Sequence, residues 1–312
     1  MTKMRAVLQN GLGGTEVLEQ VLTDKPTAGP GKIVVKVHAA GINPVDWKVR
    51  EHGYWFATPL IPGWDVSGVV TEVFPGENRF RVGDEVFGLP GFPDVGGAYA
   101  EYVTAPARHF ARKPAQLDHV EAAALPLAVL TAWQALTEAA DLRAGQRVLV
   151  HAAAGGVGHL AVQLAKALGA HVVGTASAGK HDLLRDLGAD ELVDYRTEDF
   201  TTIEPVDVVL DLIGGDDYEE RSMRVLKRGG TYIAVANPTV VDELRVKAEP
   251  FGVRVESVMV TADHAALEQV AEWVEQGRLR VVVAETFPLE EVGKAHALGE
   301  TGRTTGKIVL TV

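Results

Sequence analysis

The sequence predicts an α/β protein in which a doubly wound parallel sheet is inserted into a β-rich domain. In the first third of the chain, short apolar runs that read as strands are separated by glycine and proline. From about Val120, helices and strands alternate, which is typical of a doubly wound parallel sheet. The last segment is again similar in pattern to the first third of the chain, so we expect it to pack on the first domain. We therefore expect a β-rich domain at 1–121, completed by 285–312, and a doubly wound domain at 122–284.

The β-rich part is expected to contain strands where β-branched and aromatic residues gather, at 4–8, 33–40, 65–73, 85–87 and 99–103. The alternating part is expected to contain strands at 148–151, 171–176, 191–195, 206–212 and 231–236, with helices at 127–139, 159–169, around 183–187 and around 218–226. A strand at 253–260, a helix at 263–275 and a strand at 281–284 are assigned to the same sheet. A helix at 289–298 and a strand at 307–312 end the chain.

Length and composition limit the classes of function. At 312 residues the chain is long enough for two domains. Its net charge of −12 argues against a general nucleic-acid binder and against an anionic membrane surface as partner. The lack of cysteine excludes disulfides, thiolate metal sites and cysteine nucleophiles. We see no secretory leader and no apolar run of membrane-spanning length, so we expect a cytoplasmic location.

Residues 148–169 form the most informative stretch, because an apolar strand, a turn of small residues and a helix follow one another. Such a turn lets a pyrophosphate approach the backbone at the positive end of a helix. The turn departs from the G-x-G-x-x-G fingerprint, since Ala153 precedes Gly155 and Gly158. Taken alone, it is equally well explained as a turn that only packs a helix on a sheet. The alternating strands and helices around it favour a dinucleotide site.

The end of the second strand bears on which dinucleotide binds. An acidic residue there would bind the ribose 2′-hydroxyl of NAD. The chain instead has Ser177 and Lys180, a hydroxyl and a cation that suit the 2′-phosphate of NADP. The alternative is that Lys180 is a solvated residue at the start of the next helix.

Several runs in the chain resemble one family along nearly the whole length. They lie at 38–46, 61–68, 82–88, 97–102, 125–133, 152–158 and 306–310. In order and spacing they resemble the zinc-free quinone oxidoreductases, the zeta-crystallin-like proteins, of the medium-chain dehydrogenase/reductase superfamily. The resemblance implies a Rossmann NADP-binding domain inserted into a GroES-like catalytic domain. It also implies a homodimer formed through residues 253–260.

Comparison with the zinc-dependent alcohol dehydrogenases of that superfamily predicts that no metal is bound. Those enzymes bind the catalytic zinc with a cysteine, a histidine and a second cysteine. The resemblance places Asn43, Trp64 and Leu127 at these three positions. Tryptophan and leucine cannot ligate zinc, and the cysteine-rich lobe of the structural zinc is missing. Without a metal, hydride from NADPH needs an electron-poor acceptor such as a quinone or an α,β-unsaturated carbonyl. A hydrogen-bond donor or water must then meet the charge that develops on oxygen.

The resemblance implies two catalytic candidates, Asn43 and Thr131, and the aromatic loop at 53–56 adds Tyr54 as a third. The amide of Asn43 would hold the nicotinamide or a substrate oxygen, although an asparagine before Pro44 also suits a turn. Tyr54 would donate a proton or form a wall of the cleft. Thr131 would pack beside the nicotinamide, or its hydroxyl would satisfy backbone groups at the start of a helix. Asp46 and Asp65 match acidic family positions, and we expect them to organise the floor of the cleft.

The cofactor is expected along the carboxyl edge of the parallel sheet. The predicted cofactor-binding residues are Asn43, Thr131, Ala154, Gly155, Gly156, Val157, Ser177, Lys180, Tyr195, Ile213, Gly214, Ala236 and Arg303. The resemblance implies that Tyr195 and Arg303 join Ser177 and Lys180 around the 2′-phosphate. Residues 212–215 and 235–237 would offer backbone groups to the ribose and nicotinamide.

Aromatic residues gather in the first domain, where Trp47, Trp55 and Trp64 fall in one short span. They form either an aromatic cleft for a planar acceptor or, as we favour, ordinary core packing. We interpret His38 and His151 as core or strand-end residues.

The resulting hypothesis is a zinc-independent, NADPH-dependent quinone oxidoreductase acting on a small molecule. One alternative is an enoyl or enone reductase on the same fold. Another is a non-catalytic, crystallin-like protein that binds NADPH.

Overall fold

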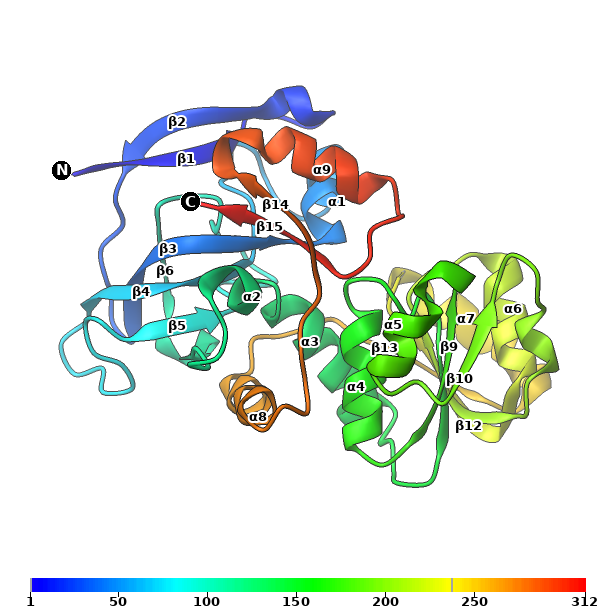
Figure 1. Cartoon of the computed structure of the whole chain (residues 1–312). Helices are drawn as coiled ribbons and strands as arrows, with labels where there is room; N and C mark the ends of the chain where they lie inside the picture. The colour runs from blue at the N-terminus through cyan, green and yellow to red at the C-terminus, as the bar shows by residue number, and fades with distance from the viewer. Residues whose placement is uncertain (1, 237) are drawn as a thin grey trace. The chain divides into compact units, whose positions relative to one another are not determined.

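The computed structural model describes residues 2–236 and 238–312, which form two compact units (Figure 1). Unit 1 comprises Met1–Leu130 and Val260–Val312, and unit 2 comprises Thr131–Met259. Unit 1 holds a mostly antiparallel sheet, and unit 2 holds a wholly parallel one. The predicted fold class is therefore confirmed. In the described part of the chain no helix is long and apolar enough to cross a membrane.

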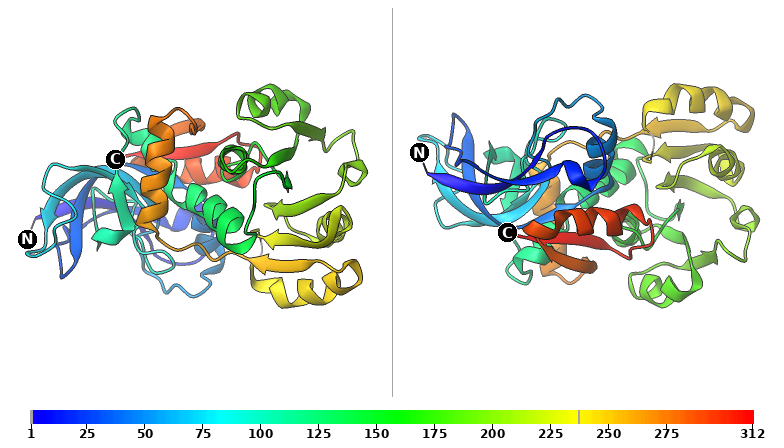
Figure 2. Two further views of the ribbon diagram at one scale, coloured as in Figure 1. Left: turned by 90° about the horizontal axis from the view of Figure 1, so that it is seen from below. Right: turned by 90° about the horizontal axis from the view of Figure 1, so that it is seen from above.

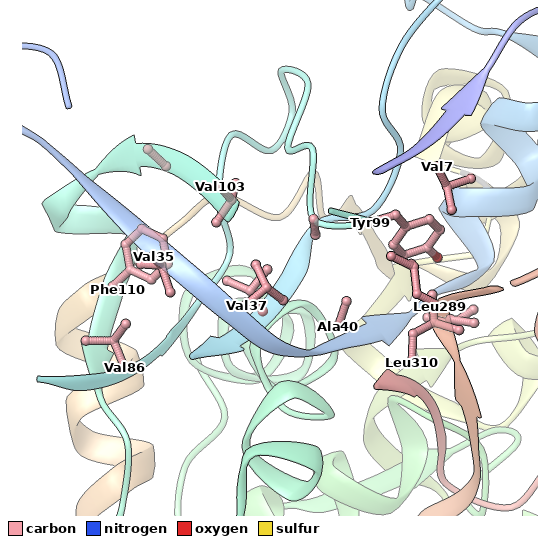
Figure 3. Close-up of a cluster of buried hydrophobic side chains, with 14 of the residues drawn as sticks. Val7, Val35, Val37, Ala40, Val86, Tyr99, Val103, Phe110, Leu289 and Leu310 are labelled. Atoms are coloured by element: carbon pink, nitrogen blue, oxygen red, sulfur yellow. The ribbon is translucent and has the colours of Figure 1, made fainter. Parts of the chain in front are cut away.

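The sheet of unit 1 has the order β14-β15-β3-β4-β5-β7, with β6 also paired to β3. Its strands are β3 (Lys32–Ile42), β4 (Asp65–Val73), β5 (Glu85–Gly88), β6 (Tyr102–Pro106), β7 (Phe110–Arg112), β14 (Val283–Pro288) and β15 (Lys307–Thr311). A separate antiparallel pair is formed by β1 (Lys3–Gln9) and β2 (Leu18–Asp24). Alternate side chains of β3, such as Val35 and Val37, enter a core that also contains Val86, Phe110 and Leu310 (Figure 3).

The helices of unit 1 are α1 (Pro44–His52), α2 (His119–Ala123), α8 (His264–Glu275) and α9 (Val292–Glu300). A fifth, α3 (Pro126–Trp133), begins in unit 1 and continues as a π-helical segment, Gln134–Ala139. Close contact between α1 and α9 depends on Gly299, because a Cβ atom there would lie 2.6 Å from the ring of Trp47. This approach brings Arg50 of α1 within hydrogen-bond distance of His296 and Glu300 of α9.

Unit 2 contains six parallel strands in the order β10-β9-β8-β11-β12-β13. The strands are β8 (Arg147–Val150), β9 (His171–Ala176), β10 (Glu191–Asp194), β11 (Val206–Asp211), β12 (Leu226–Ala234) and β13 (Arg254–Ser257). The helices are α4 (Gly158–Ala167), α5 (His181–Asp186), α6 (Asp216–Arg224) and α7 (Val241–Ala248). In chain order the strands run 3-2-1-4-5-6, the Rossmann arrangement, whose order reverses between β8 and β11. Figure 2 shows β12 and β13, yellow to orange, at one end of this sheet.

The structure corrects the assignment of two elements near the C-terminus. The helix at 263–275 and the strand at 281–284 do not extend the doubly wound sheet, so that assignment was wrong. Instead α8 packs on β7, and β14 pairs in parallel with β15 in unit 1. The apolar face of α8 is evident in its sequence, but helical periodicity does not say which sheet the face covers. The units accordingly divide at Leu130 and Val260, which differs from the expected domain bounds.

Candidate functional site

In unit 2, the predicted cofactor residues from Ala154 onward lie directly after the carboxyl ends of successive strands. Ala154 to Val157 follow β8, Ser177 and Lys180 follow β9, Tyr195 follows β10, Ile213 and Gly214 follow β11, and Ala236 follows β12. In a sheet of this order these ends meet at one edge, where dinucleotides bind. The structure therefore brings them to a common edge. Of the residues at 235–237, position 237 lies outside the described residues.

The turn after β8 explains why its first fingerprint position is not glycine. The positive φ of 46° belongs to Ala152, so the backbone at position 153 does not require glycine. Gly158 does need to be glycine, because a Cβ atom there would lie 2.3 Å from the carbonyl oxygen of Ala152. On the neighbouring strand, a Cβ atom at Gly174 would lie 3.0 Å from the methyl of Ala153. The small residues thus hold the start of α4 close to the sheet, with its first N–H groups at the edge.

In the loop after β11, two of the backbone N–H groups are already bound within the protein. The carboxylate of Asp211, 1% exposed, accepts hydrogen bonds from the backbone N–H groups of Ile213 (2.9 Å) and Gly214 (3.1 Å). The hydroxyl of Tyr232 donates to the same carboxylate. Because Asp211 occupies both N–H groups, the carbonyl oxygens are the backbone groups of Ile213 and Gly214 that are left for a ligand. Carbonyl oxygens accept hydrogen bonds from ribose hydroxyls.

Cations follow two neighbouring strands at this edge. Lys180 lies after β9, and Arg196 lies after β10 with its guanidinium 5.8 Å from the centre of the Tyr195 ring. Tyr195 is 49% exposed. The sequence analysis missed Arg196, although a cation beside an aromatic residue at a strand end was a usable signal. Together with Ser177, these groups offer the charge and the donors that bind a phosphate.

His151 belongs to the core of unit 2 and does not face a ligand. It follows β8 directly, is fully buried, and contacts the hydroxyls of Thr175 (3.1 Å) and Ser222 (2.9 Å). Burial lowers the pKa of His151 to about 4, so the ring is neutral. Its interpretation as a strand-end core residue is in accord with this environment.

In unit 1, Asn43 lies at the centre of a buried polar cluster, where β3 ends and α1 begins. The register pairs Gly41 with Asp65 and Ile42 with Ile308, so the ends of β3, β4 and β15 lie side by side. The amide nitrogen of Asn43 donates to Asp65 Oδ2 (2.8 Å), and the ammonium of Lys307 donates to Asn43 Oδ1. Asn43, Asp65 and Lys307 are at most 3% exposed.

The same cluster includes both carboxylates that we expected to organise the cleft. Asp65 Oδ1 accepts from the backbone N–H of Leu127 (2.7 Å), while the ammonium of Lys307 lies 3.3 Å from Asp65 Oδ2. Asp46 Oδ2 accepts from the backbone N–H of Asn43 (2.6 Å), so Asp46 closes the first turn of α1. Each carboxylate therefore fixes a group of Asn43, and a role for the pair in the floor of a cleft stays a prediction.

A second chain of hydrogen bonds runs away from Asp46. The hydroxyl of Tyr99 donates to Asp46 Oδ2 (2.9 Å) and lies 3.3 Å from His296 Nε2. His296 Nδ1 lies 3.1 Å from a guanidinium nitrogen of Arg50, which can only donate. His296 therefore accepts at Nδ1 and carries its proton at Nε2. Burial beside Arg50 lowers the pKa of His296 to about 3, which keeps this ring neutral.

Tyr54 and the three tryptophans separate into surface and core. Tyr54 is 51% exposed and adopts a positive φ of 49°, and Trp55 beside it is 54% exposed. The indole of Trp64 is fully buried, and that of Trp47 packs against His296. Core packing therefore describes Trp64 and Trp47, whereas Trp55 and Tyr54 form an exposed aromatic surface.

The remaining candidates are placed as follows. Thr131 is buried in α3, and Arg303 is exposed in the segment between α9 and β15. Asn43, Tyr54 and Arg303 belong to unit 1, whereas the other predicted site residues belong to unit 2. The sequence analysis missed Lys307, Tyr99 and His296, because lysine and histidine give no sequence signal of deep burial.

The groups around Asn43 do not suit a zinc ion. Trp64 and Leu127 offer no metal ligand, and the Lys307 ammonium lies at the oxygens of Asn43 and Asp65 where a cation would be repelled. Among residues 2–236 and 238–312, no three histidine or acidic side chains gather as a metal site. A developing charge on oxygen would have to be met here by hydrogen-bond donors.

Comparison with known proteins agrees with this architecture. Family models described as alcohol dehydrogenase GroES-like domain and zinc-binding dehydrogenase match residues 29–115 and 187–310. The chain is 35% identical to a 2-methylene-furan-3-one reductase of Solanum lycopersicum, over 99% of this chain and 79% of the relative. It is also 35% identical to a chloroplastic NADPH-dependent alkenal/one oxidoreductase of Arabidopsis thaliana, with the same coverage.

A solved structure extends the likeness to the whole chain. The quinone oxidoreductase of Coxiella burnetii is 37% identical, with a TM-score of 0.93 and full coverage of both chains. Sequence, fold and relatives agree along both units. The chain therefore belongs to the medium-chain dehydrogenase/reductase superfamily, among its quinone-oxidoreductase-like members.

Proposed function

We propose that this oxidoreductase transfers hydride from NADPH to a quinone or a similar electron-poor carbonyl compound, without a metal. The observation that carries the proposal is the polar cluster of unit 1, in which the amide of Asn43 is held with an N–H donor left for a ligand. The resemblance implies that Asn43 stands where the zinc-dependent enzymes carry a metal ligand. The quinone oxidoreductase of Coxiella burnetii supports a quinone as acceptor.

The residues at the sheet edge of unit 2 would hold NADPH. The turn from Ala154 to Val157 and the first N–H groups of α4 suit the pyrophosphate. Ser177, Lys180, Tyr195 and Arg196 suit the 2′-phosphate, and the carbonyl oxygens after β11 suit a ribose. When bound, NADPH supplies the hydride from C4 of its nicotinamide ring.

The residues of unit 1 would serve the acceptor. Asn43 donates a hydrogen bond to a carbonyl oxygen and stabilises the charge that develops there. Tyr54 donates the proton that neutralises the reduced oxygen. Thr131 would pack beside the nicotinamide, and Arg303 would contribute charge to the 2′-phosphate.

A panel of benzoquinones, small enones and enoyl thioesters, followed by the loss of NADPH absorbance, tests the proposal. We expect turnover of quinones. The names of the tomato and Arabidopsis relatives favour an enone reductase as the second candidate. Exclusive turnover of thioesters would contradict the first proposal, and NADPH binding with no turnover of any acceptor would indicate a non-catalytic, crystallin-like protein.

We also propose that two copies associate through β13. This strand, Arg254–Ser257, ends the parallel sheet, so one of its edges has no neighbouring strand in the described part of the chain. Measuring the mass in solution tests the homodimer, and a monomer would contradict it. Cell fractionation tests the proposed cytoplasmic location.

A further inference from the structure

We propose that Lys307 is a positioning residue that fixes the side-chain amide of Asn43, so that Asn43 presents an N–H group to a carbonyl oxygen of a bound ligand. The carbonyl belongs either to the acceptor or to the carboxamide of the nicotinamide. The identity of the ligand rests on the proposed function, whereas the orientation of the amide rests on the geometry of unit 1 alone.

The orientation of the Asn43 amide follows from the charges on its two sides. The Lys307 ammonium has three N–H donors and no acceptor, so the atom of Asn43 that faces it must be the oxygen. The Asp65 carboxylate accepts hydrogen bonds when ionised, so the atom of Asn43 at 2.8 Å from it must be the nitrogen. Two buried groups of opposite charge thus specify the same orientation.

Neither charged group is free to turn away. Lys307 uses all three donors, on the carbonyl oxygen of Ile42 (2.8 Å), on Asn43 Oδ1 and on Asp65 Oδ2 (3.3 Å). The Asp65 carboxylate is held at its other oxygen by the backbone N–H of Leu127. Because these partners are all buried, the amide has one arrangement that satisfies the cluster.

The fixed amide has only one kind of group left for a ligand. Its oxygen is bound to Lys307, and one of its two N–H groups is bound to Asp65. The second N–H has no acceptor among the described residues. A cation on the oxygen also polarises the amide and strengthens the remaining donor. Asn43 is therefore suited to a carbonyl oxygen and unsuited to a ligand N–H group.

A purely structural role for Lys307 would be to neutralise the buried Asp65. The double variant Lys307→Met with Asp65→Asn separates this role from positioning, because it removes both charges together. In the double variant, the N–H of Leu127 still requires an oxygen at the position that Asp65 Oδ1 occupies in the wild type. The amide nitrogen introduced at position 65 then faces Asn43, whose own amide must invert. The inverted amide offers an oxygen to the ligand carbonyl, which it repels.

The experiment compares the wild type with Lys307→Met, Lys307→Arg and the double variant. Thermal unfolding verifies that each variant is folded. The matched control is Lys113→Met, because Lys113 is also a nearly buried lysine of unit 1, 3.3 Å from Glu85 and bonded to the carbonyl of Leu117. We expect it to lose stability but to retain cofactor binding and turnover.

We expect the double variant to fold. Either its kcat/KM for a quinone or its NADPH affinity should fall about 100-fold, as when one donor to a developing oxyanion is removed. A loss in kcat/KM for a quinone with unchanged NADPH affinity assigns the carbonyl to the acceptor. A loss of NADPH affinity assigns it to the nicotinamide. Lys307→Arg, which keeps the charge and the donors, should retain more activity than Lys307→Met. A folded double variant with unchanged NADPH affinity and unchanged kcat/KM would overturn the proposal.

A readout without turnover keeps the inference separate from the proposed function. The side-chain amide signal of Asn43 in nitrogen-15 NMR, identified by its absence in Asn43→Ser, should shift in the double variant and remain in place in Lys113→Met. If the wild type reduces no quinone, the proposed function fails while this signal still tests the role of Lys307. An unshifted signal would contradict that role.

Discussion

The hydroxyl of Tyr99 donates a hydrogen bond of 2.9 Å to Asp46 Oδ2, while the other oxygen of Asp46 is buried without any partner. The carboxylate is fully buried. Burial raises the pKa of Asp46 from 3.8 to about 7, although the hydrogen bonds from Asn43 and Tyr99 oppose this shift. Asp46 therefore keeps its proton in the folded protein at a pH where it is ionised in the unfolded chain.

This difference predicts a dependence of stability on pH. Between about pH 4 and pH 7 the folded state binds more protons at Asp46 than the unfolded state does, so the free energy of unfolding falls as the pH rises. The shift from 3.8 to about 7 corresponds to a loss of up to about 4 kcal/mol. Asp46→Asn resembles the protonated form and should lack this contribution.

Urea unfolding at a series of pH values measures the prediction. The difference in stability between Asp46→Asn and the wild type should grow in favour of the variant as the pH rises from 4 to 7. In the control Tyr99→Phe, the loss of the hydrogen-bond donor should raise the pKa of Asp46 further. The free energy of unfolding should then continue to fall up to a higher pH than in the wild type. A difference that does not vary with pH would rule out a raised pKa.

The second prediction concerns Tyr54 as proton donor. Tyr54 is 51% exposed, so Tyr54→Phe should leave the unfolding temperature unchanged. Loss of a general acid should lower kcat by about 100-fold or more. Stopped-flow and steady-state assays with a quinone measure it, and Tyr102→Phe, elsewhere in unit 1, serves as the control. Equal kcat in both variants would reassign Tyr54 to the wall of the cleft.

The third prediction concerns the choice of cofactor. Lys180→Ala should weaken NADPH binding about tenfold or more, because one charge-assisted bond to the 2′-phosphate is lost. NADH, which lacks this phosphate, should bind the variant as it binds the wild type. Lys166→Ala is the control, since Lys166 pairs with Asp190 away from the sheet edge. Titrations of intrinsic fluorescence give both affinities, and unchanged NADPH affinity in Lys180→Ala would exclude this residue from the phosphate site.

Much of the fold could be predicted from the sequence because burial leaves a pattern. The apolar run Val148 to Val150, which is buried, and the small residues after it indicate the doubly wound sheet in the sequence alone. β2 was missed because none of its residues is fully buried and its apolar residues, Leu18, Val21 and Leu22, do not alternate with polar ones. α1 was missed because Asn43 and Pro44 also suit a simple turn.

The polar cluster was far less visible in the sequence. Asn43 was singled out, but its partner Lys307 lies 264 residues away and was recognised only as part of a closing strand. Lysine is rarely fully buried, so nothing in its local sequence indicates a role inside the protein. Only the register of β3, β4 and β15 places the three charged and polar groups together.

The fourth prediction concerns metal removal. Because Trp64 and Leu127 offer no ligand and Lys307 occupies the oxygens of Asn43 and Asp65, dialysis against a strong chelator should leave kcat and the unfolding temperature unchanged. A zinc-dependent alcohol dehydrogenase treated in parallel should lose its activity. Activity that falls on dialysis and returns with added zinc would contradict the zinc-independent mechanism.

The fifth prediction tests the turn after β8. In Gly158→Ala the new Cβ atom would lie 2.3 Å from the carbonyl oxygen of Ala152, so the turn must shift away from the sheet. The misfit should cost about 2 kcal/mol of stability, as for other overpacked sites, and displace the N–H groups that bind the pyrophosphate. Gly11→Ala, in unit 1, is the control, because a Cβ atom there meets nothing within 4 Å and its φ is not positive. Urea unfolding and NADPH titration should both distinguish the two variants. If Gly158→Ala binds NADPH as tightly as Gly11→Ala does, the close approach at Gly158 serves packing alone and the pyrophosphate lies elsewhere.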